Sequence, residues 1–194
     1  MLGQSAISAA TCVESLSVSV FPTDAGWVGI AGHGHVLKSL SIGYASQAEC
    51  LARFQDDLAA GGEIADWNPA LRNRIQKFLN GKGVDDFQDI DTVVTESTPF
   101  AARVIAAVRA IPAGEVKSYA DIAAASGSPK ASRAVGNIMA RNTIPLVIPC
   151  HRVVASGGRL GGYSSPRGLS MKTRLLELEG VTDKAASRYL SLAK

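Results

Sequence analysis

The spacing of apolar residues changes once along the 194-residue chain, and this change limits the folds that the chain can adopt. Residues 15–21 alternate serine with Leu16, Val18 and Val20, which is the period of a strand with one buried face. Between residues 100 and 111, apolar side chains recur at every third or fourth position, which predicts an amphipathic helix. The sequence therefore predicts an α/β domain followed by a mainly α-helical domain.

The first domain is expected to span residues 1–91 and to contain a small antiparallel sheet with helices. Residues 1–13 are small and polar and are expected to be disordered, and residues 23–26 predict a hairpin turn. The acidic, irregular stretch at residues 85–96 predicts a linker. The remaining expected elements are strands at residues 27–31 and 36–44 and helices at residues 46–60 and 69–79.

The second domain is expected to span residues 92–194. Thr98 can cap a helix, and Pro99 suits its first position. Ser118 and Asp121 have the spacing of a capping box, which predicts a helix at residues 119–125. A turn at Gly127 and a second helix at residues 128–141 would complete a helix-turn-helix. A final helix is expected from Ser170 to a stop before Gly180.

Charge is distributed unevenly between the two predicted domains. Residues 1–97 contain 6 Lys or Arg and 12 Asp or Glu, whereas residues 98–194 contain 14 and 5. A basic half favours a polyanionic partner, because each neutralised phosphate releases condensed counterions. The alternative interpretation is a solvated surface with chance segregation of charge.

The cysteine and histidine residues argue against a disulfide framework and against a metal site. Three scattered cysteines suit a reducing compartment, and no apolar run approaches the ~20 residues that cross a bilayer. No secretory signal is evident, so a cytoplasmic protein without membrane contact is expected, nucleoid-associated if prokaryotic. No metal and no cofactor are expected, because compact ligand spacing is missing among Cys12, Cys50, His33 and His35.

Cys150 and His151 are adjacent within the segment Ile148 to Val154, which reads Ile-Pro-Cys-His-Arg-Val-Val. A thiol becomes a nucleophile as its thiolate, and a neighbouring imidazole can accept the proton directly or through water. The apolar run at residues 143–147 predicts a buried strand that ends in a proline-stiffened turn. The pair alone is weak evidence, because most cysteines are inert core residues.

A wider set of segments resembles the O6-alkylguanine-DNA alkyltransferases, also called methylated-DNA–protein-cysteine methyltransferases, in order and spacing over about half of the chain. Residues 1–97 resemble the family more loosely, at residues 23–27 and 78–81. The segments that carry the resemblance are residues 98–100, 111–119 and 129–136, Asn142, and residues 148–154, 157–158, 162–164 and 175–180.

This resemblance implies direct-reversal DNA repair. The alkyl group of O6-alkylguanine in double-stranded DNA would pass irreversibly to Cys150, so that one molecule repairs one lesion. O4-alkylthymine would be a second candidate substrate. The implied enzyme is a methylated-DNA–[protein]-cysteine S-methyltransferase that acts once, binds the minor groove through its helix-turn-helix and flips the damaged nucleotide out of the helix. A monomer is expected.

The resemblance also assigns catalytic roles to individual residues. Glu179 would orient His151, which would deprotonate Cys150 through a water, as a carboxylate fixes the imidazole in a catalytic triad. Tyr119 would assist flipping and donate a proton toward the leaving guanine. Asn142 would hold the turn before the active-site segment.

The predicted recognition helix carries unusually small residues, which suit close approach to a narrow minor groove. By resemblance, Arg133 would enter the base stack and replace the extruded nucleotide. The carbonyls of Cys150 and Val153 would read the guanine amine, and the loop at Ser164-Ser165 would supply a donor to O6. The other residues expected to contact DNA are Lys130, Ala131, Ser132, Ala134, Gly136 and Arg141, and Tyr163 is expected to line the pocket.

Two departures from the family pattern bear on the pocket. Ser165-Pro166-Arg167 stands where a glycine pair is common, and Ala113 replaces a usual aromatic residue.

Three other functions compete with alkyl transfer. A non-enzymatic lesion sensor would lack Cys150. A transcriptional regulator would need long base-reading side chains on its recognition helix. A Cys-His hydrolase would explain neither Arg133 nor the uneven charge.

Overall fold

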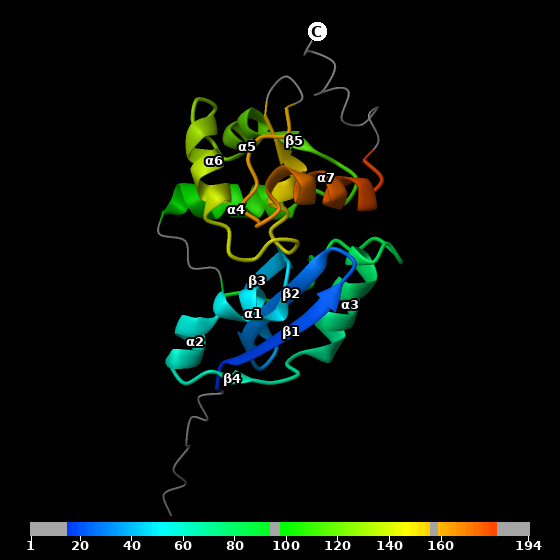
Figure 1. Cartoon of the computed structure of the whole chain (residues 1–194). Helices are drawn as coiled ribbons and strands as arrows, with labels where there is room; N and C mark the ends of the chain where they lie inside the picture. Colours follow the sequence, from blue (N-terminus) through cyan, green and yellow to red (C-terminus); the bar gives the residue numbers. More distant parts are fainter. Residues whose placement is uncertain (1–14, 94–97, 156–158, 182–194) are drawn as a thin grey trace, which may run out of the picture.

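The computed structural model describes residues 15–93, 98–155 and 159–181. A sheet with three helices, α1 to α3, forms one half of the molecule, and helices α4 to α7 form the other (Figure 1). The expected disorder at residues 1–13, Cys12, the last part of the predicted linker and the glycine pair 157–158 lie outside the described residues.

The sheet has the strand order β3-β2-β1-β4 and is mixed. Strands β1 (Ser17–Thr23), β2 (Gly26–His33) and β3 (Val36–Tyr44) are antiparallel, as predicted. The short strand β4 (Glu63–Ile64) runs parallel to β1, so the prediction of a purely antiparallel sheet was wrong. The chain crosses through two helices before it returns to the edge of the sheet, and such a crossover permits parallel pairing.

The predicted helix at residues 46–60 is two short helices, α1 (Gln47–Ala52) and α2 (Gln55–Ala59). The break falls at Phe54, whose backbone is not helical and whose ring is buried. A Cβ atom on Gly29 of β2 would lie 2.3 Å from this ring. The helix therefore breaks where an aromatic side chain packs closely against the sheet, which helical periodicity does not reveal.

Helix α3 (Pro69–Leu79) has the predicted bounds. The Asn68 side chain accepts a hydrogen bond from the Leu71 amide, and Pro69 occupies the first turn, where its missing N–H costs nothing. Leu71, Ile75 and Phe78 are buried with the apolar face of the sheet, so the helix covers that face.

The second half contains α4 (Pro99–Arg109), α5 (Tyr119–Ala125), α6 (Ser132–Ala140) and α7 (Gly168–Leu178). The Thr98 cap and the Ser118–Asp121 capping box are present, and the bounds of α5 are as predicted. Helix α6 begins later than expected, because residues 128–131 form a turn closed by the Ala131 amide donating to the Ser128 carbonyl. Strands β5 (Lys117–Ser118) and β6 (Val153–Val154) pair in parallel near the 3-10 helix η1 (Cys150–Arg152).

The predicted strand at residues 143–147 is wrong, because this segment is a buried turn. Leu146 has a left-handed backbone with φ 74°, and the Ile148 amide donates to the Ile144 carbonyl at 2.9 Å. Pro145 has no N–H to contribute to a sheet. The apolar side chains are buried as expected, but they belong to a turn that positions η1.

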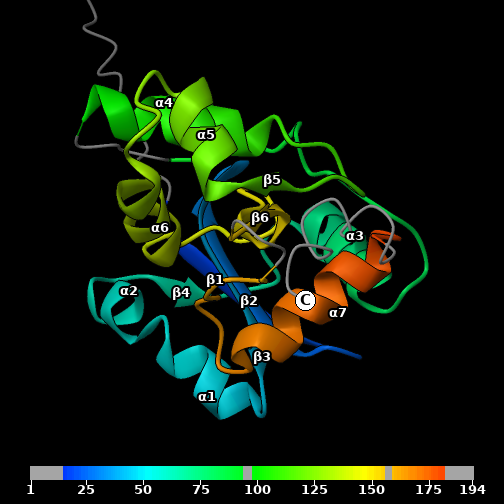
Figure 2. The ribbon, with the colours of Figure 1, turned by 90° about the horizontal axis from the view of Figure 1, so that it is seen from above.

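The two halves share one hydrophobic core and are joined by backbone contacts. The Leu40 amide of β3 donates to the Thr143 carbonyl at 2.9 Å, and Arg174 of α7 donates to the Leu79 carbonyl at the end of α3. Figure 2 shows α7 beside α3.

The segment that connects the two halves is attached to α3. Its residues Asp85 and Asp89 both form ion pairs with Arg74, so the described part of this segment is anchored to that helix. The division into domains at residues 91 and 92 remains a prediction.

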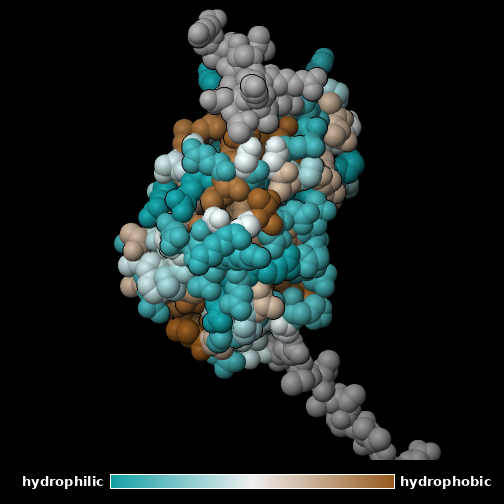
Figure 3. Space-filling view, turned by 90° about the vertical axis from the view of Figure 1, so that its right-hand side faces the viewer, coloured by the Kyte–Doolittle hydropathy of each residue, from teal (hydrophilic) through white to brown (hydrophobic). Residues whose placement is uncertain are grey.

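The described part of the chain has no helix long and apolar enough to cross a membrane. On the side of the molecule that Figure 3 presents, hydrophilic residues cover most of the surface, and apolar residues form separate groups. Within the same residues, no cluster of three or more His, Cys, Asp or Glu side chains could hold a metal ion.

Ser118→Ala should lower the free energy of unfolding by about 1 kcal/mol, because the Asp121 amide loses its acceptor at the start of α5. Urea unfolding at neutral pH measures the change. An unchanged unfolding midpoint would contradict a stabilising role for this capping box.

Candidate active site

Cys150 is held at the start of η1 by the preceding turn. The Asn142 side-chain amide donates to the Ile148 carbonyl at 2.8 Å and lies 3.2 Å from the Cys150 sulfur. Its side-chain oxygen accepts from the Ile144 amide at 3.0 Å. One side chain therefore fixes both ends of the turn and donates toward the thiol.

Behind the thiol, His151, Arg152 and Glu179 form a buried cluster. The His151 Nε2 atom lies 2.8 Å from a Glu179 carboxylate oxygen. The Arg152 guanidinium donates to both carboxylate oxygens through Nε at 3.1 Å and to one of them through Nη2 at 2.8 Å. It also donates to the Ile111 carbonyl at 2.6 Å. The carboxylate therefore neutralises the arginine and holds the imidazole at one nitrogen.

Burial and hydrogen bonding set the charges in this cluster. Burial by itself would raise the pKa of Glu179, but hydrogen bonds and charges from His151 and Arg152 lower it to about 2. Burial lowers the pKa of His151, although Glu179 opposes this effect. Burial raises the pKa of the Cys150 thiol, against a hydrogen bond from Asn142 and the charge of Lys172. The resting cluster therefore favours an ionised carboxylate and a neutral imidazole.

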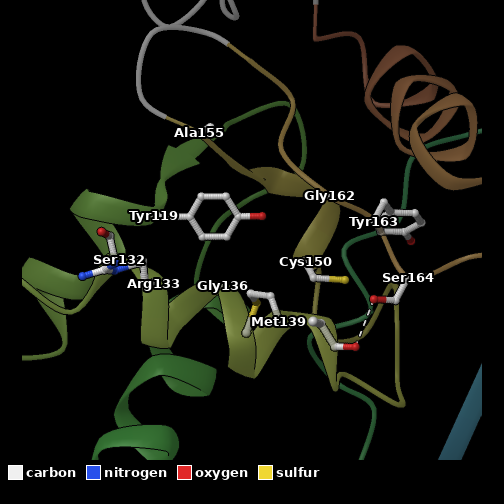
Figure 4. A pocket seen from close by; sticks show the side chains of 11 residues that line it. Tyr119, Ser132, Arg133, Gly136, Met139, Cys150, Ala155, Gly162, Tyr163 and Ser164 are labelled. Atoms are coloured by element: carbon white, nitrogen blue, oxygen red, sulfur yellow. Dashed lines mark hydrogen bonds between the residues drawn. The ribbon is translucent and has the colours of Figure 1, made fainter.

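Cys150 opens onto a cavity of about 490 Å³. Figure 4 shows the Tyr119 hydroxyl pointing into this cavity from one side and Tyr163 and Ser164 lying on the other. The Ser164 hydroxyl donates to the Ala140 carbonyl at 3.0 Å, which joins the pocket loop to the end of α6. The lining residues are Tyr119, Ser132, Arg133, Gly136, Met139, Ala140, Cys150, Ala155, Gly162, Tyr163 and Ser164.

The position of Tyr119 depends on both its helix and the loop that covers it. Tyr119 is the first residue of α5, directly after the Ser118 cap. Gly161 has φ 69°, and a Cβ atom there would lie 3.0 Å from the tyrosine ring and 3.1 Å from its hydroxyl. Only glycine therefore lets the loop both turn and close over Tyr119.

The structure brings together most of the predicted site residues, but not all of them line the cavity. Arg133 is exposed on α6 at the cavity rim, and Ala134 is exposed on the same helix. Ser165 and Arg141 line an adjacent groove of about 500 Å³ and not the cavity at Cys150, and the role of Ser165 in the substrate pocket remains a prediction. The loop turns after Ser164, where the Ser165 hydroxyl caps the Arg167 amide at 3.2 Å.

Three further predicted residues lie outside the cavity lining. Val153 is buried, and its carbonyl accepts from Lys172 at 2.6 Å. Lys130 and Ala131 line a shallow hollow before α6. The contact of the Val153 carbonyl with the guanine amine remains a prediction.

Sequence reasoning gave no role to Arg152 or Lys172, which are both buried. Arg152 stood within the Cys-His segment but had no assigned partner. Lys172 falls on one helical face with Leu176 and Glu179, at spacings of four and seven residues. A lysine on the helical face that the apolar periodicity predicts to be buried could have identified Lys172 from the sequence.

Comparisons with known proteins agree with the geometry. A family model, the 6-O-methylguanine DNA methyltransferase DNA-binding domain, matches residues 99–181. A Mycobacterium leprae methylated-DNA–protein-cysteine methyltransferase is 35% identical over 150 residues, which are 77% of this chain and 84% of that protein. The chain belongs to this methyltransferase family. The constitutive Bacillus subtilis protein of the same name is 47% identical over 89 residues, 46% of this chain.

The Bacillus subtilis alignment spans 53% of that protein, so the chain matches about half the length of this relative. A crystal structure of Mycobacterium tuberculosis OGT in complex with DNA superposes with a TM-score of 0.68 at 28% identity. That match covers 88% of this chain and 99% of the other. The family likeness therefore extends across both halves of the fold.

Glu179→Gln should lower the free energy of unfolding at neutral pH by about 3 to 5 kcal/mol, because Arg152 would be buried without a counter-charge. In the parent, the Glu179 pKa is lowered from 4.5 to about 2, so its stabilisation is complete above the ordinary pKa and is lost as pH falls toward the lowered value. The variant should therefore lose less stability than the parent on acidification, as measured by urea unfolding.

Glu177→Gln provides a matched control, because Glu177 is exposed on the same helix. It should behave like the parent at each pH. Parallel stability curves for the parent and Glu179→Gln would contradict the assigned role of the carboxylate.

Proposed function

We propose that the protein repairs alkylated DNA by transferring the alkyl group of O6-alkylguanine to the Cys150 sulfur. The observation that carries this proposal is a buried thiol at the end of a cavity whose rim holds an exposed arginine, Arg133. A base inside a duplex cannot reach such a thiol, so the nucleotide would have to flip into the cavity. O4-alkylthymine is a second candidate substrate.

Activation of the thiol would use His151 as a general base. Glu179 accepts the hydrogen bond from Nε2–H, which leaves the neutral ring with a lone pair on Nδ1. The Nδ1 atom of His151 is buried and has no hydrogen-bond partner among the described residues. This nitrogen would take the thiol proton through a water, and the imidazolium would be stabilised by Glu179. Asn142, which donates toward the sulfur, would stabilise the thiolate.

The transfer itself would be a displacement at carbon. The thiolate forms a bond to the alkyl carbon while the bond from that carbon to O6 breaks, and the electron pair leaves with guanine. Tyr119, whose hydroxyl points into the cavity, would supply the proton that neutralises the leaving base. The product is a thioether with no step that regenerates the thiol, so each molecule would act once.

DNA binding would use α5 and α6 as a helix-turn-helix. The exposed and half-buried positions of α6 carry the small residues Ser132, Ala134 and Gly136, which permit close approach to the minor groove. Arg133 would enter the stack in place of the flipped nucleotide. The Mycobacterium tuberculosis neighbour was crystallised in complex with DNA, which supports DNA as the partner. We infer a monomer that acts on double-stranded DNA inside the cell.

Replacing Cys150 by Ala should abolish alkyl transfer while DNA affinity stays within a fewfold of the parent, because phosphate contacts supply most of that affinity. Intact mass after incubation with O6-methylguanine duplex measures transfer, and the parent should gain one methyl group that maps to Cys150. Cys50→Ala is the matched control, since the buried Cys50 thiol has a pKa raised to about 12 and lies outside the cavity lining. Transfer to the Cys150→Ala variant would overturn the proposal.

Arg133→Ala should slow the repair of duplex DNA much more than the reaction with free O6-benzylguanine, which needs no flipping. The expected difference is roughly 10- to 100-fold, corresponding to the few kcal/mol of unstacking. Single-turnover rates on the two substrates measure it. Lys82→Ala, which removes an exposed cation from the first half, controls for loss of charge. Equal losses on both substrates would rule out a role in flipping.

A further inference from the structure

A second hollow, a groove of about 500 Å³, lies beside the candidate active site. One wall comes from the first half of the molecule, from β3 and from the turn between α1 and α2. The other wall comes from the end of α6, the turn before η1 and the pocket loop. Ala140, Tyr163 and Ser164 line both the groove and the cavity at Cys150. The groove therefore begins where the wall of the cavity ends.

Most of the charged side chains that line the groove are cations. They are Lys38, Arg53 and Arg141, against one acid, Asp57. Lys38 forms an ion pair with Asp57 at 2.6 Å. Arg53 and Arg141 are exposed, and neither belongs to any of the ion pairs in the described part of the chain. Each wall of the groove therefore carries one guanidinium group whose charge is not balanced by a carboxylate.

Arg53 differs from the other arginines of the acidic first half. Residues 1–97 contain 6 Lys or Arg and 12 Asp or Glu, so carboxylates outnumber cations there. Arg72 and Arg74 both form ion pairs with aspartates, whereas Arg53, which directly follows α1, does not. Ion pairing within the fold therefore does not explain the position of Arg53, and an anionic ligand in the groove does.

The groove lies on the side of the molecule that carries the proposed recognition helix. In Figure 1 and in Figure 2, α2 of the first half and α6 lie on the same side. Arg141 directly follows α6, and Arg133 lies on the same helix at the rim of the cavity. Because a flipped nucleotide stays attached to its strand, the backbone on either side of it must pass beside the mouth of the cavity. The groove is adjacent to that path.

We propose that this groove binds the phosphate backbone of the DNA strand that carries the flipped nucleotide, with Arg53 and Arg141 as the contacts. A guanidinium group suits this role, because its planar fork donates two parallel hydrogen bonds to a phosphate. Backbone contacts fix the register of a protein on DNA without reading the sequence. The first half would thereby help to align the damaged nucleotide with the cavity. This inference deepens the proposed function and rests on it for DNA as the partner.

The test is the salt dependence of binding to an unmodified DNA duplex, measured by fluorescence anisotropy. Each phosphate contact contributes about 0.9 to the slope of log K against log salt concentration, so Arg53→Gln should reduce the slope by that amount and weaken binding roughly fivefold to tenfold at about 0.1 M salt. Arg53→Lys, which keeps the charge, should keep the slope. Lys82→Gln is the matched control, because it removes an exposed cation of the first half that lies outside the groove lining. An Arg53→Gln slope equal to that of the parent would overturn the proposal.

A gain of affinity gives a second test that a folding defect cannot imitate. Asp57 neutralises Lys38, so Asp57→Asn leaves a third cation of the groove without a counter-charge. This variant should bind the unmodified duplex more tightly and steepen the slope by up to about 0.9. Asp56→Asn is the matched control, because it removes an exposed acid of the same helix that lies outside the groove lining. Equal affinities of the two variants would show that the backbone does not enter the groove.

Both tests use DNA without an alkylated base, so their outcome is separate from that of the proposed function. A parent that shows the expected salt slopes but accepts no methyl group from O6-methylguanine DNA would overturn only the repair activity. Methyl transfer by the parent, together with an unchanged slope in Arg53→Gln, would overturn only the role of the groove.

Discussion

The carboxylate of Glu179 joins three separate segments, and the candidate site depends on this junction. It accepts hydrogen bonds from His151 and Arg152 beside Cys150, and more weakly from the Gly114 amide at 3.4 Å. Arg152 extends the junction to the Ile111 carbonyl after α4. Removing one partner from such a buried pair leaves an uncompensated charge, which costs more than the pair contributes. The same contacts that hold the imidazole therefore also hold α7 against η1.

In the proposed function, the site combines a buried thiol with the groups that would ionise it. Burial raises the pKa of Cys150, which favours the protonated resting form and limits unwanted reactions. Asn142 and Lys172 act in the opposite direction, through a hydrogen bond and through charge. In the proposed function, the small residues of α6 and Gly161 would leave room for a base. Reactivity would then be restricted to a partner that can enter the cavity.

The first half of the molecule contacts the segments that form the candidate site. The Leu40 amide of β3 donates to the Thr143 carbonyl, at the start of the turn that presents Cys150. Gly43 at the end of the same strand has φ 85°, and a Cβ atom there would lie 2.6 Å from the Met171 side chain of α7. The sheet therefore contacts both the active-site turn and the helix that carries Lys172. These contacts give the first half a structural role.

Local sequence determined the features that depend on neighbouring residues. The alternation before Phe21, the caps at Thr98 and Ser118 and the Cys150-His151 segment could all be identified from spacing, because periodicity and capping act within a few residues. Local spacing could not identify three other features, which are the parallel strand β4, the break at Phe54 and the buried turn before Ile148. Apolar runs look alike whether they fold as a strand or as a turn, and pairing at a sheet edge depends on distant segments.

The same distinction applies to the site. The sequence placed Cys150 next to His151, and the family resemblance implied the catalytic roles of this pair and of Glu179. Only the tertiary structure decided that Arg152 shares Glu179 and that the buried Lys172 donates to the Val153 carbonyl behind η1. These charges act through space between residues up to 28 positions apart in the chain. Their partners are set when α7 packs against η1, and no local pattern encodes that contact.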